Sequence, residues 1–219
     1  MTASSASPAS EIVRTLRQGL GQELLKVGPD APTLCEGWNT TDLAAHLVIR
    51  EARPDAALGI IGGPLAWWTR RVQNREAQRP YAEIVGSFMG GPPTFSPFRI
   101  SGLDASANLF EYFIHGEDVR RAQPGWEPRV LPDEVQDLLW SRLSRSAGTL
   151  LRRVPTGLTL ERTGNESASV VVRQGPAMVT VRGDAGELVL RSYGRAQVRV
   201  VVSGDPDAIA SFEATKLGA

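Results

Sequence analysis

The 219-residue chain is long enough for one large domain or two small ones, with a core that needs no disulfide or metal for its stability. Apolar residues make up 42% of the chain and charged residues 22%, which excludes a disordered or fibrous protein. Because 24 basic residues balance 24 acidic ones, no net charge draws the chain to nucleic acid, and the single cysteine, Cys35, excludes an internal disulfide and a cysteine-cluster zinc site.

The sequence has no segment typical of membrane insertion or export. The longest uncharged stretches, 56–68 and 84–98, are shorter than a bilayer span and are interrupted by glycine and proline. Residues 1–9 lack the basic and apolar regions of a signal peptide, so we expect a disordered polar leader there. We therefore expect a cytoplasmic protein with no membrane or nucleic-acid partner.

Apolar residues that recur every three to four positions predict four long helices, over 10–27, 40–53, 103–124 and 132–150. Ser10 is the expected cap of the first, and the run from Asn39 to Asp42 opens the second. Shorter helices are expected over 65–78 and 80–89, and prolines make regular structure unfavourable over 90–98. Four long helices indicate a four-helix bundle.

The hydrophobic period changes from about 3.6 to two after Pro155, which predicts short antiparallel strands near 158–160, 170–172, 179–181 and 198–202. Asp184 and Glu187 have the spacing of a capping box for a short helix that stops at Gly194, and 205–217 reads as a last helix. The prediction is an α+β multidomain protein, with a helical domain at 10–154 and a small α+β domain at 155–219.

The chain's two histidines, His46 and His115, both fall within predicted helices. Glu111 precedes His115 by four residues, so the two side chains share one helix face with Cβ atoms about 5–6 Å apart. With His46 supplied by a facing helix, two imidazoles and one carboxylate could hold zinc or another divalent metal and leave one position open. The same set occurs around non-haem iron, and the alternative is that all three are ordinary core or surface residues.

Other charged residues could support such a site. Asp118 follows His115 by three residues and Asp42 precedes His46 by four, so either could accept the outer N–H of a ligating imidazole. Equally, Asp42 could serve the first turn of its helix and Asp118 could pair with an arginine. Arg50, one turn beyond His46, could bind a substrate carboxylate or simply face solvent.

The sequence lacks the usual signs of a hydrolase. Leu47 follows His46 and Gly116 follows His115, so the metalloprotease pattern His-Glu-x-x-His is absent. Glu117 lies about 200° around the helix from His115 and is expected to point away from a metal. We expect Cys35 to be a packed small side chain outside the mechanism.

Two segments carry a resemblance to a known family. Leu34-Cys-Glu-Gly-Trp-Asn-Thr-Thr-Asp-Leu-Ala-Ala-His46, and later Glu111-Tyr-Phe-Ile-His115-Gly-Glu-Asp118, resemble the metal-binding domain of mycothiol-dependent maleylpyruvate isomerases and the wider DinB-like superfamily. The resemblance implies a four-helix bundle that holds a divalent metal, usually zinc, with His46, Glu111 and His115 at the ligand positions.

The C-terminal part is similar to the small α+β domain that often follows this bundle, on the segment Glu187-Leu-Val-Leu-Arg-Ser-Tyr-Gly-Arg195. That similarity places Arg195 near the site as a second residue for binding substrate. The implied function is a mycothiol-type, thiol-dependent isomerase or S-transferase acting on a small electrophile, with Arg50 or Arg195 neutralising a substrate carboxylate. The alternatives are metal-assisted hydrolysis and a non-catalytic metal- or ligand-binding module.

Overall fold

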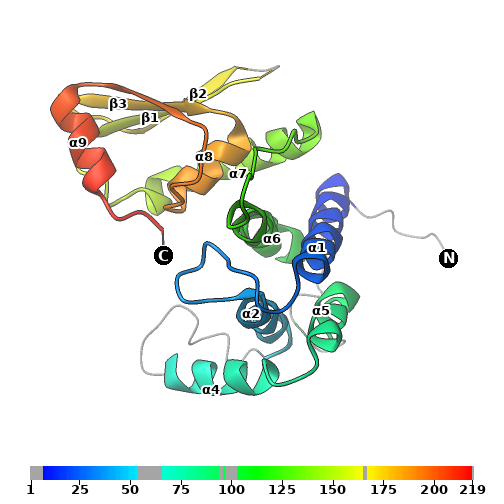
Figure 1. The fold of residues 1–219 in the computed structure, drawn as a ribbon. Helices are drawn as coiled ribbons and strands as arrows, with labels where there is room; N and C mark the ends of the chain where they lie inside the picture. Colours follow the sequence, from blue (N-terminus) through cyan, green and yellow to red (C-terminus); the bar gives the residue numbers. More distant parts are fainter. Residues whose placement is uncertain (1–6, 54–65, 94–95, 97–102, 165–166, 219) are drawn as a thin grey trace. The chain divides into compact units, whose positions relative to one another are not determined.

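A computed structural model describes residues 7–53, 66–93, 96, 103–164 and 167–218 of the chain (Figure 1). Its described residues form eight helices and one four-stranded sheet, which confirms the predicted α+β class. The chain divides into two compact units, Met1–Trp126 and Glu127–Ala219, each of which is described by itself. The change of hydrophobic period places a boundary later, at 154–155, and those domain limits stay a prediction.

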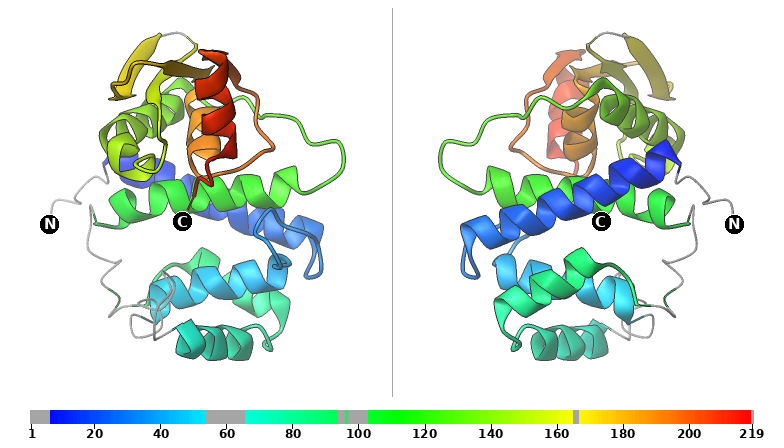
Figure 2. Two further views of the ribbon diagram at one scale, coloured as in Figure 1. Left: turned by 90° about the vertical axis from the view of Figure 1, so that its left-hand side faces the viewer. Right: turned by 90° about the vertical axis from the view of Figure 1, so that its right-hand side faces the viewer.

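The first unit contains five of the helices: α1 (Pro8–Val27), α2 (Thr40–Ala52), α4 (Ala66–Glu76), α5 (Tyr81–Gly90) and α6 (Leu103–Arg121). Helices α1 and α6 lie side by side, and α2 contacts α4 and α5 (Figure 2). Fully buried apolar and aromatic side chains form the core between these helices, among them Leu20, Leu24, Leu43, Leu47, Phe88, Tyr112 and Phe113. The fourth long helix falls in the second unit, so the predicted four-helix bundle is not confirmed.

The starts of the first two helices show which local signals were correct. The N-cap of α1 is Ser7, whose hydroxyl accepts a bond from the Ser10 N–H, so the predicted Ser10 cap is wrong. Pro8 fits the first turn of α1 because the N–H groups of a first turn have no partner within the helix, and proline has no N–H. Pro8 and Ala9, expected in the leader, are therefore helical, while 1–6 lie outside the described residues. The Asn39 cap of α2 is confirmed.

The second unit contains α7 (Asp133–Leu150), α8 (Ala185–Ser192), α9 (Pro206–Ala214) and strands β1 (Gly157–Arg162), β2 (Ala168–Arg173), β3 (Met178–Gly183) and β4 (Val201–Gly204). The strand order is β2-β1-β3-β4. β1 pairs antiparallel with β2 but parallel with β3, so the sheet is mixed and the prediction of antiparallel strands is wrong for this pair.

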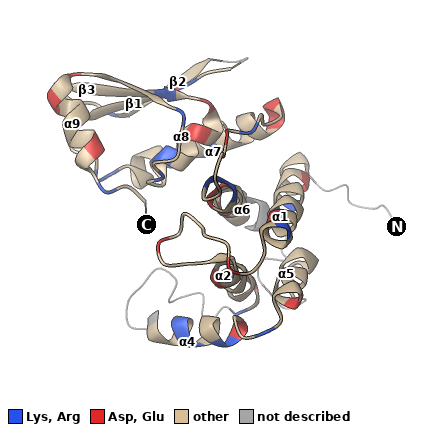
Figure 3. Cartoon of the chain, in the orientation of Figure 1, with Lys and Arg blue, Asp and Glu red and all other residues tan. Residues whose placement is uncertain are grey.

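One face of the sheet is buried and the other is more open. Leu158, Leu160, Val179 and Val181 alternate with more exposed residues and lie against the helices, as period-two patterning requires. The predicted capping box at Asp184 is wrong, because Glu187 instead accepts a bond from the Arg199 N–H at 2.6 Å. Basic and acidic side chains are interspersed along the elements of both units (Figure 3). None of the described helices has the length and apolar character needed to span a bilayer.

Candidate metal centre

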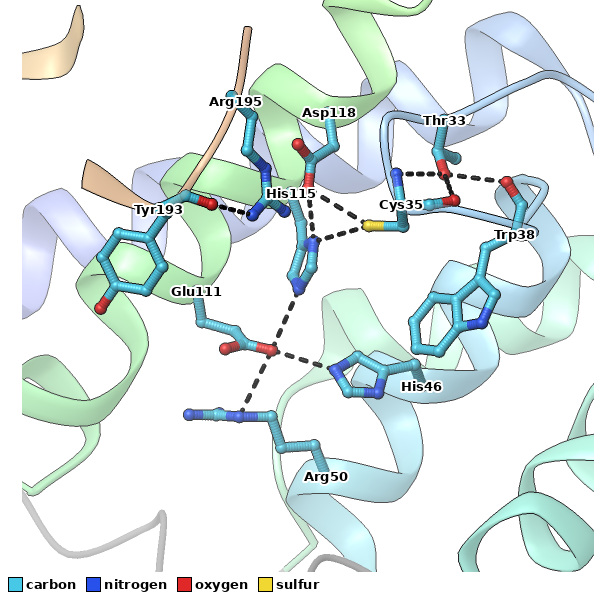
Figure 4. A network of polar contacts seen from close by, with 10 residues as sticks. All are labelled: Thr33, Cys35, Trp38, His46, Arg50, Glu111, His115, Asp118, Tyr193 and Arg195. Atoms are coloured by element: carbon cyan, nitrogen blue, oxygen red, sulfur yellow. Dashed lines mark hydrogen bonds and ion pairs between the residues drawn. The ribbon is translucent and has the colours of Figure 1, made fainter. Parts of the chain in front are cut away.

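The three residues predicted to bind metal converge in the first unit (Figure 4). The Nε2 atom of His46 lies 3.1 Å from Glu111 Oε1, and the Nε2 atom of His115 lies 3.3 Å from the same oxygen. The ligand atoms of all three residues lie within 4.8 Å of one another. Sequence spacing predicted that Glu111 and His115 share a face, and the fold adds His46 from α2.

Local structure explains why these side chains are where they are. The Asn39 amide oxygen accepts from the Asp42 N–H at 2.9 Å and the Asp42 carboxylate accepts from the Asn39 N–H at 3.1 Å, which fixes the start of α2 and places Asp42 one turn before His46. On α6, Glu111 and His115 are neighbours because they lie four residues apart. Both helices bury apolar faces, so the candidate ligands are carried by packed helices rather than by a loop.

Two of the three separations between the ligand atoms are close to those around a divalent ion. Metal–nitrogen and metal–oxygen bonds of about 2.0–2.2 Å in a tetrahedron put neighbouring ligand atoms about 3.3–3.5 Å apart. The separations of 3.1 and 3.3 Å from Glu111 Oε1 to the two imidazole nitrogens are near this value and require only a small adjustment. Three protein ligands would leave a fourth position for a small molecule.

The charge states of His46 and Glu111 also suit a cation. Burial lowers the pKa of His46, so its imidazole is neutral at pH 7 and has a lone pair for a metal. Burial alone would raise the pKa of Glu111, but hydrogen bonds with His115 and His46 and the charge of Arg50 hold this pKa well below 4.5. The centre therefore presents a neutral imidazole and a charged carboxylate to the same point.

His115 has polar partners on both ring nitrogens. Its Nδ1 atom lies 3.0 Å from Asp118 Oδ2, while Nε2 faces Glu111. Burial alone would lower the pKa of His115, but hydrogen bonds with Asp118, Cys35 and Glu111 raise it well above 6.5. Asp118 is fully buried and lies within hydrogen-bond distance of Nδ1, and its role as support for a metal-bound His115 stays a prediction.

Cys35 is the residue that sequence reasoning missed. Its sulfur lies 3.3 Å from Asp118 Oδ2 and 3.6 Å from His115 Nδ1. Cys35, His115 and Asp118 form a second group of possible metal ligands, which shares His115 with the first. The signal was the position of Cys35 in the loop just before α2, although nothing in its spacing points to a residue 80 positions away.

Other predicted site residues have different surroundings. Arg50 Nε lies 3.4 Å from Glu111 Oε1, and Arg50 also donates to the buried Asn108 side chain. Asp42 takes the capping role, and the structure gives it no bond to His46 within the described residues. That Asp42 accepts the outer N–H of a metal-bound His46 stays a prediction.

Trp38 and Glu117 lie close to the triad of His46, Glu111 and His115. The Trp38 ring packs on the His46 ring with centroids 5.0 Å apart. Glu117 is buried and accepts a hydrogen bond from Arg121 Nε at 2.7 Å, as expected of a side chain that points away from the candidate ligands. In the second unit, Arg195 donates to the Tyr193 carbonyl at 2.8 Å, and its proposed place near the triad stays a prediction.

Comparison with known proteins gives a fold likeness only. No protein-family model and no curated protein matches the sequence. Two crystal structures of the mycothiol-dependent maleylpyruvate isomerase, one of them a mutant with a histidine replaced by alanine, resemble this fold with TM-scores of 0.60 for the mutant and 0.56 for the other. In both cases the identity is 16%, and the match covers 93% of this chain and 96% of the other. The TM-scores and the coverage support a shared fold, and an identity of 16% shows nothing beyond it, so membership of the DinB-like superfamily stays a prediction.

Proposed function

We propose that the chain binds one divalent metal ion, zinc before others, through His46, Glu111 and His115, and acts as a thiol-dependent isomerase or S-transferase on a small electrophile. The convergence of three ligand atoms from two helices carries the metal part of the proposal. The thiol part rests on the likeness in fold to structures whose names describe a mycothiol-dependent isomerase. Such an enzyme would work in the cytoplasm, where small thiols stay reduced.

The chemistry follows from what the residues can hold. A divalent metal would favour the thiolate form of a thiol at its open position at neutral pH. Such a thiolate would supply a nucleophile for an electron-poor double bond conjugated to a carbonyl. Reversible addition, with the electron pair passing to the carbonyl oxygen and back, would allow rotation about the former double bond and release the isomerised alkene and the thiolate, whereas protonation and retention of the adduct would amount to S-transfer.

The chain's own residues have distinct tasks in this scheme. His46 and Glu111 would bind the metal. Asp118 bonds Nδ1 of His115, so that Nε2 of the same ring faces the centre. Arg50 lies beside Glu111, where its guanidinium can also attract the carboxylate of a substrate. Arg195 is the second candidate for that task, on the resemblance of its segment.

The hydrolase alternative has less support. A metal-assisted hydrolase needs a carboxylate base next to the bound water, and Glu117 is committed to Arg121 and Arg120. The non-catalytic alternative keeps the metal and predicts no turnover.

The first experiment measures metal per folded chain for wild type and for His46→Ala, Glu111→Ala and His115→Ala. Glu83→Ala is the matched control, because this carboxylate is 62% exposed and lies on α5. We expect about one zinc in wild type and control, and loss of stoichiometric zinc in the three variants with the helical circular dichroism kept. Full occupancy in the His115→Ala variant would refute the site.

The second experiment assays the zinc-loaded wild type with mycothiol and a cis-configured unsaturated keto acid, with and without the thiol. Turnover that needs both thiol and metal supports the proposal. Thiol-independent cleavage of an ester would indicate the hydrolase, and metal binding with no turnover on any electrophile would indicate the binding module.

A further inference from the structure

The loop between α1 and α2 is tied to α6 at several points. The Leu34 N–H donates to the Asp118 carbonyl at 3.1 Å, and Gln123 Nε2 donates to the Pro32 carbonyl at 3.1 Å. These bonds join the backbone on both sides of Thr33 to the end of the helix that carries Glu111 and His115. The loop is therefore held relative to the metal centre.

Bonds inside the loop fix Cys35 itself. The Thr33 hydroxyl accepts from the Cys35 N–H at 3.1 Å and donates to the Trp38 carbonyl at 2.9 Å, while the Trp38 N–H donates to the Cys35 carbonyl at 3.0 Å. Both backbone polar groups of Cys35 are thus bonded within a tight turn, so its side chain has a defined direction (Figure 4).

That direction brings the sulfur to a buried carboxylate. Cys35 Sγ lies 3.3 Å from Asp118 Oδ2, and the same oxygen lies 3.0 Å from His115 Nδ1. A thiol is a weak donor, and a fully buried carboxylate is costly unless donors surround it. The thiol and the imidazole N–H therefore both donate to one oxygen of Asp118.

We propose that Cys35 is a positioning residue for His115, acting through Asp118. The thiol holds the Asp118 carboxylate in place, and the carboxylate holds one proton of His115 on Nδ1, so that Nε2 is the nitrogen that faces the centre and would give up its proton to a binding metal. The inference rests on the proposed function and extends it, because it assigns a role to a thiol that is neither ligand nor nucleophile.

The experiment is a zinc-affinity series measured by competition with a chromophoric chelator. The variants are Cys35→Ser, which keeps a donor, Cys35→Ala, which removes it, Asp118→Asn, and the double variant Cys35→Ala/Asp118→Asn. Loss of a group behind a metal ligand weakens affinity about 10- to 100-fold. We expect Cys35→Ala to lose roughly tenfold, and Cys35→Ser to stay within about threefold of wild type.

The double variant separates positioning from simple packing. If Cys35 acts through Asp118, removing the thiol from a chain whose Asp118 carboxylate is already replaced by an amide adds no further loss, so the double variant matches Asp118→Asn. Multiplied losses would overturn the inference, as would an unchanged affinity in Cys35→Ala. The melting temperature of each metal-free variant is measured alongside, because a packing defect lowers it whether or not metal is present.

Cobalt replaces zinc in the last measurement. We expect the Co²⁺ protein to lack a thiolate-to-cobalt charge-transfer band, because Cys35 stays a thiol outside the coordination shell. Such a band in wild type, lost in Cys35→Ser, would make Cys35 a ligand and overturn the inference while leaving metal binding intact. A wild type that takes up no zinc or cobalt would instead refute the proposed function, and this inference with it.

Discussion

Substitution of Arg17 tests what holds together α2 and α6, the two helices that carry the candidate ligands. Arg17 on α1 donates to Glu51 of α2 at 2.6 Å, to Tyr112 of α6 at 2.5 Å and to the Phe88 carbonyl of α5 at 2.9 Å. Arg17 is 5% exposed and Glu51 is 3% exposed. One cation therefore joins α2 to α6, which carry His46 on one side and Glu111 and His115 on the other.

The size of the effect follows from the charge that is left behind. Arg17→Met keeps the length of the side chain but leaves the Glu51 carboxylate buried with a hydrogen bond from Tyr112. Breaking a buried ion pair in this way costs about 3–5 kcal/mol of unfolding free energy. For a chain of this size that corresponds to a fall in melting temperature of about 6–20 °C.

The assay is urea unfolding of wild type, Arg17→Met and Arg17→Met/Glu51→Gln. The glutamine still accepts from Tyr112 but carries no charge, so the double variant should regain about 2 kcal/mol or more. Burial already raises the pKa of Glu51 from 4.5, and loss of Arg17 raises it further, so the gap between wild type and Arg17→Met should narrow as the pH falls toward 4.5. A single variant within about 1 kcal/mol of wild type, or a double variant no better than the single, would refute this reasoning.

Two further predictions concern the centre. Because the folded pKa of His115 is raised well above 6.5, metal-free protein should gain stability from this group below pH 6.5 and lose that gain as the pH rises through the folded pKa. Melting temperatures in the presence of chelator should show the decline in wild type, and an equal decline in His115→Gln would contradict it. Arg50→Ala should raise KM for a carboxylate substrate roughly 10- to 100-fold with zinc content unchanged, and a normal KM would remove Arg50 from substrate binding.

Much of the fold followed from periodicity and capping chemistry. The stripe of α1 and the Asn39 cap of α2 are strong local signals, and the structure agrees with both. The errors arose where two local signals competed, as at Ser7 and Ser10, both hydroxyls near Pro8. The parallel pairing of β1 with β3 was out of reach, because strand direction depends on the path of the chain and not on the pattern within a strand.

The candidate centre divides in the same way. Glu111 and His115 could be paired from spacing alone, since both lie on one helix. His46 lies 65 residues from Glu111, so its approach depends on the packing of α2 and α6 and needed the family resemblance. Neither spacing nor the family resemblance pointed to Cys35. This residue lies in a loop, 83 positions before Asp118 in the sequence.

The placement of all these groups before Glu127 has a consequence for the order of synthesis. The ligands, Asp118, Cys35 and Arg50 all belong to Met1–Trp126, whereas the second unit follows as one continuous segment. At about 5–20 residues per second, its translation takes roughly 5–20 seconds. All three candidate ligands, His46, Glu111 and His115, are therefore synthesised seconds before the last strand of the sheet, and none of them has to wait for a residue of the second unit.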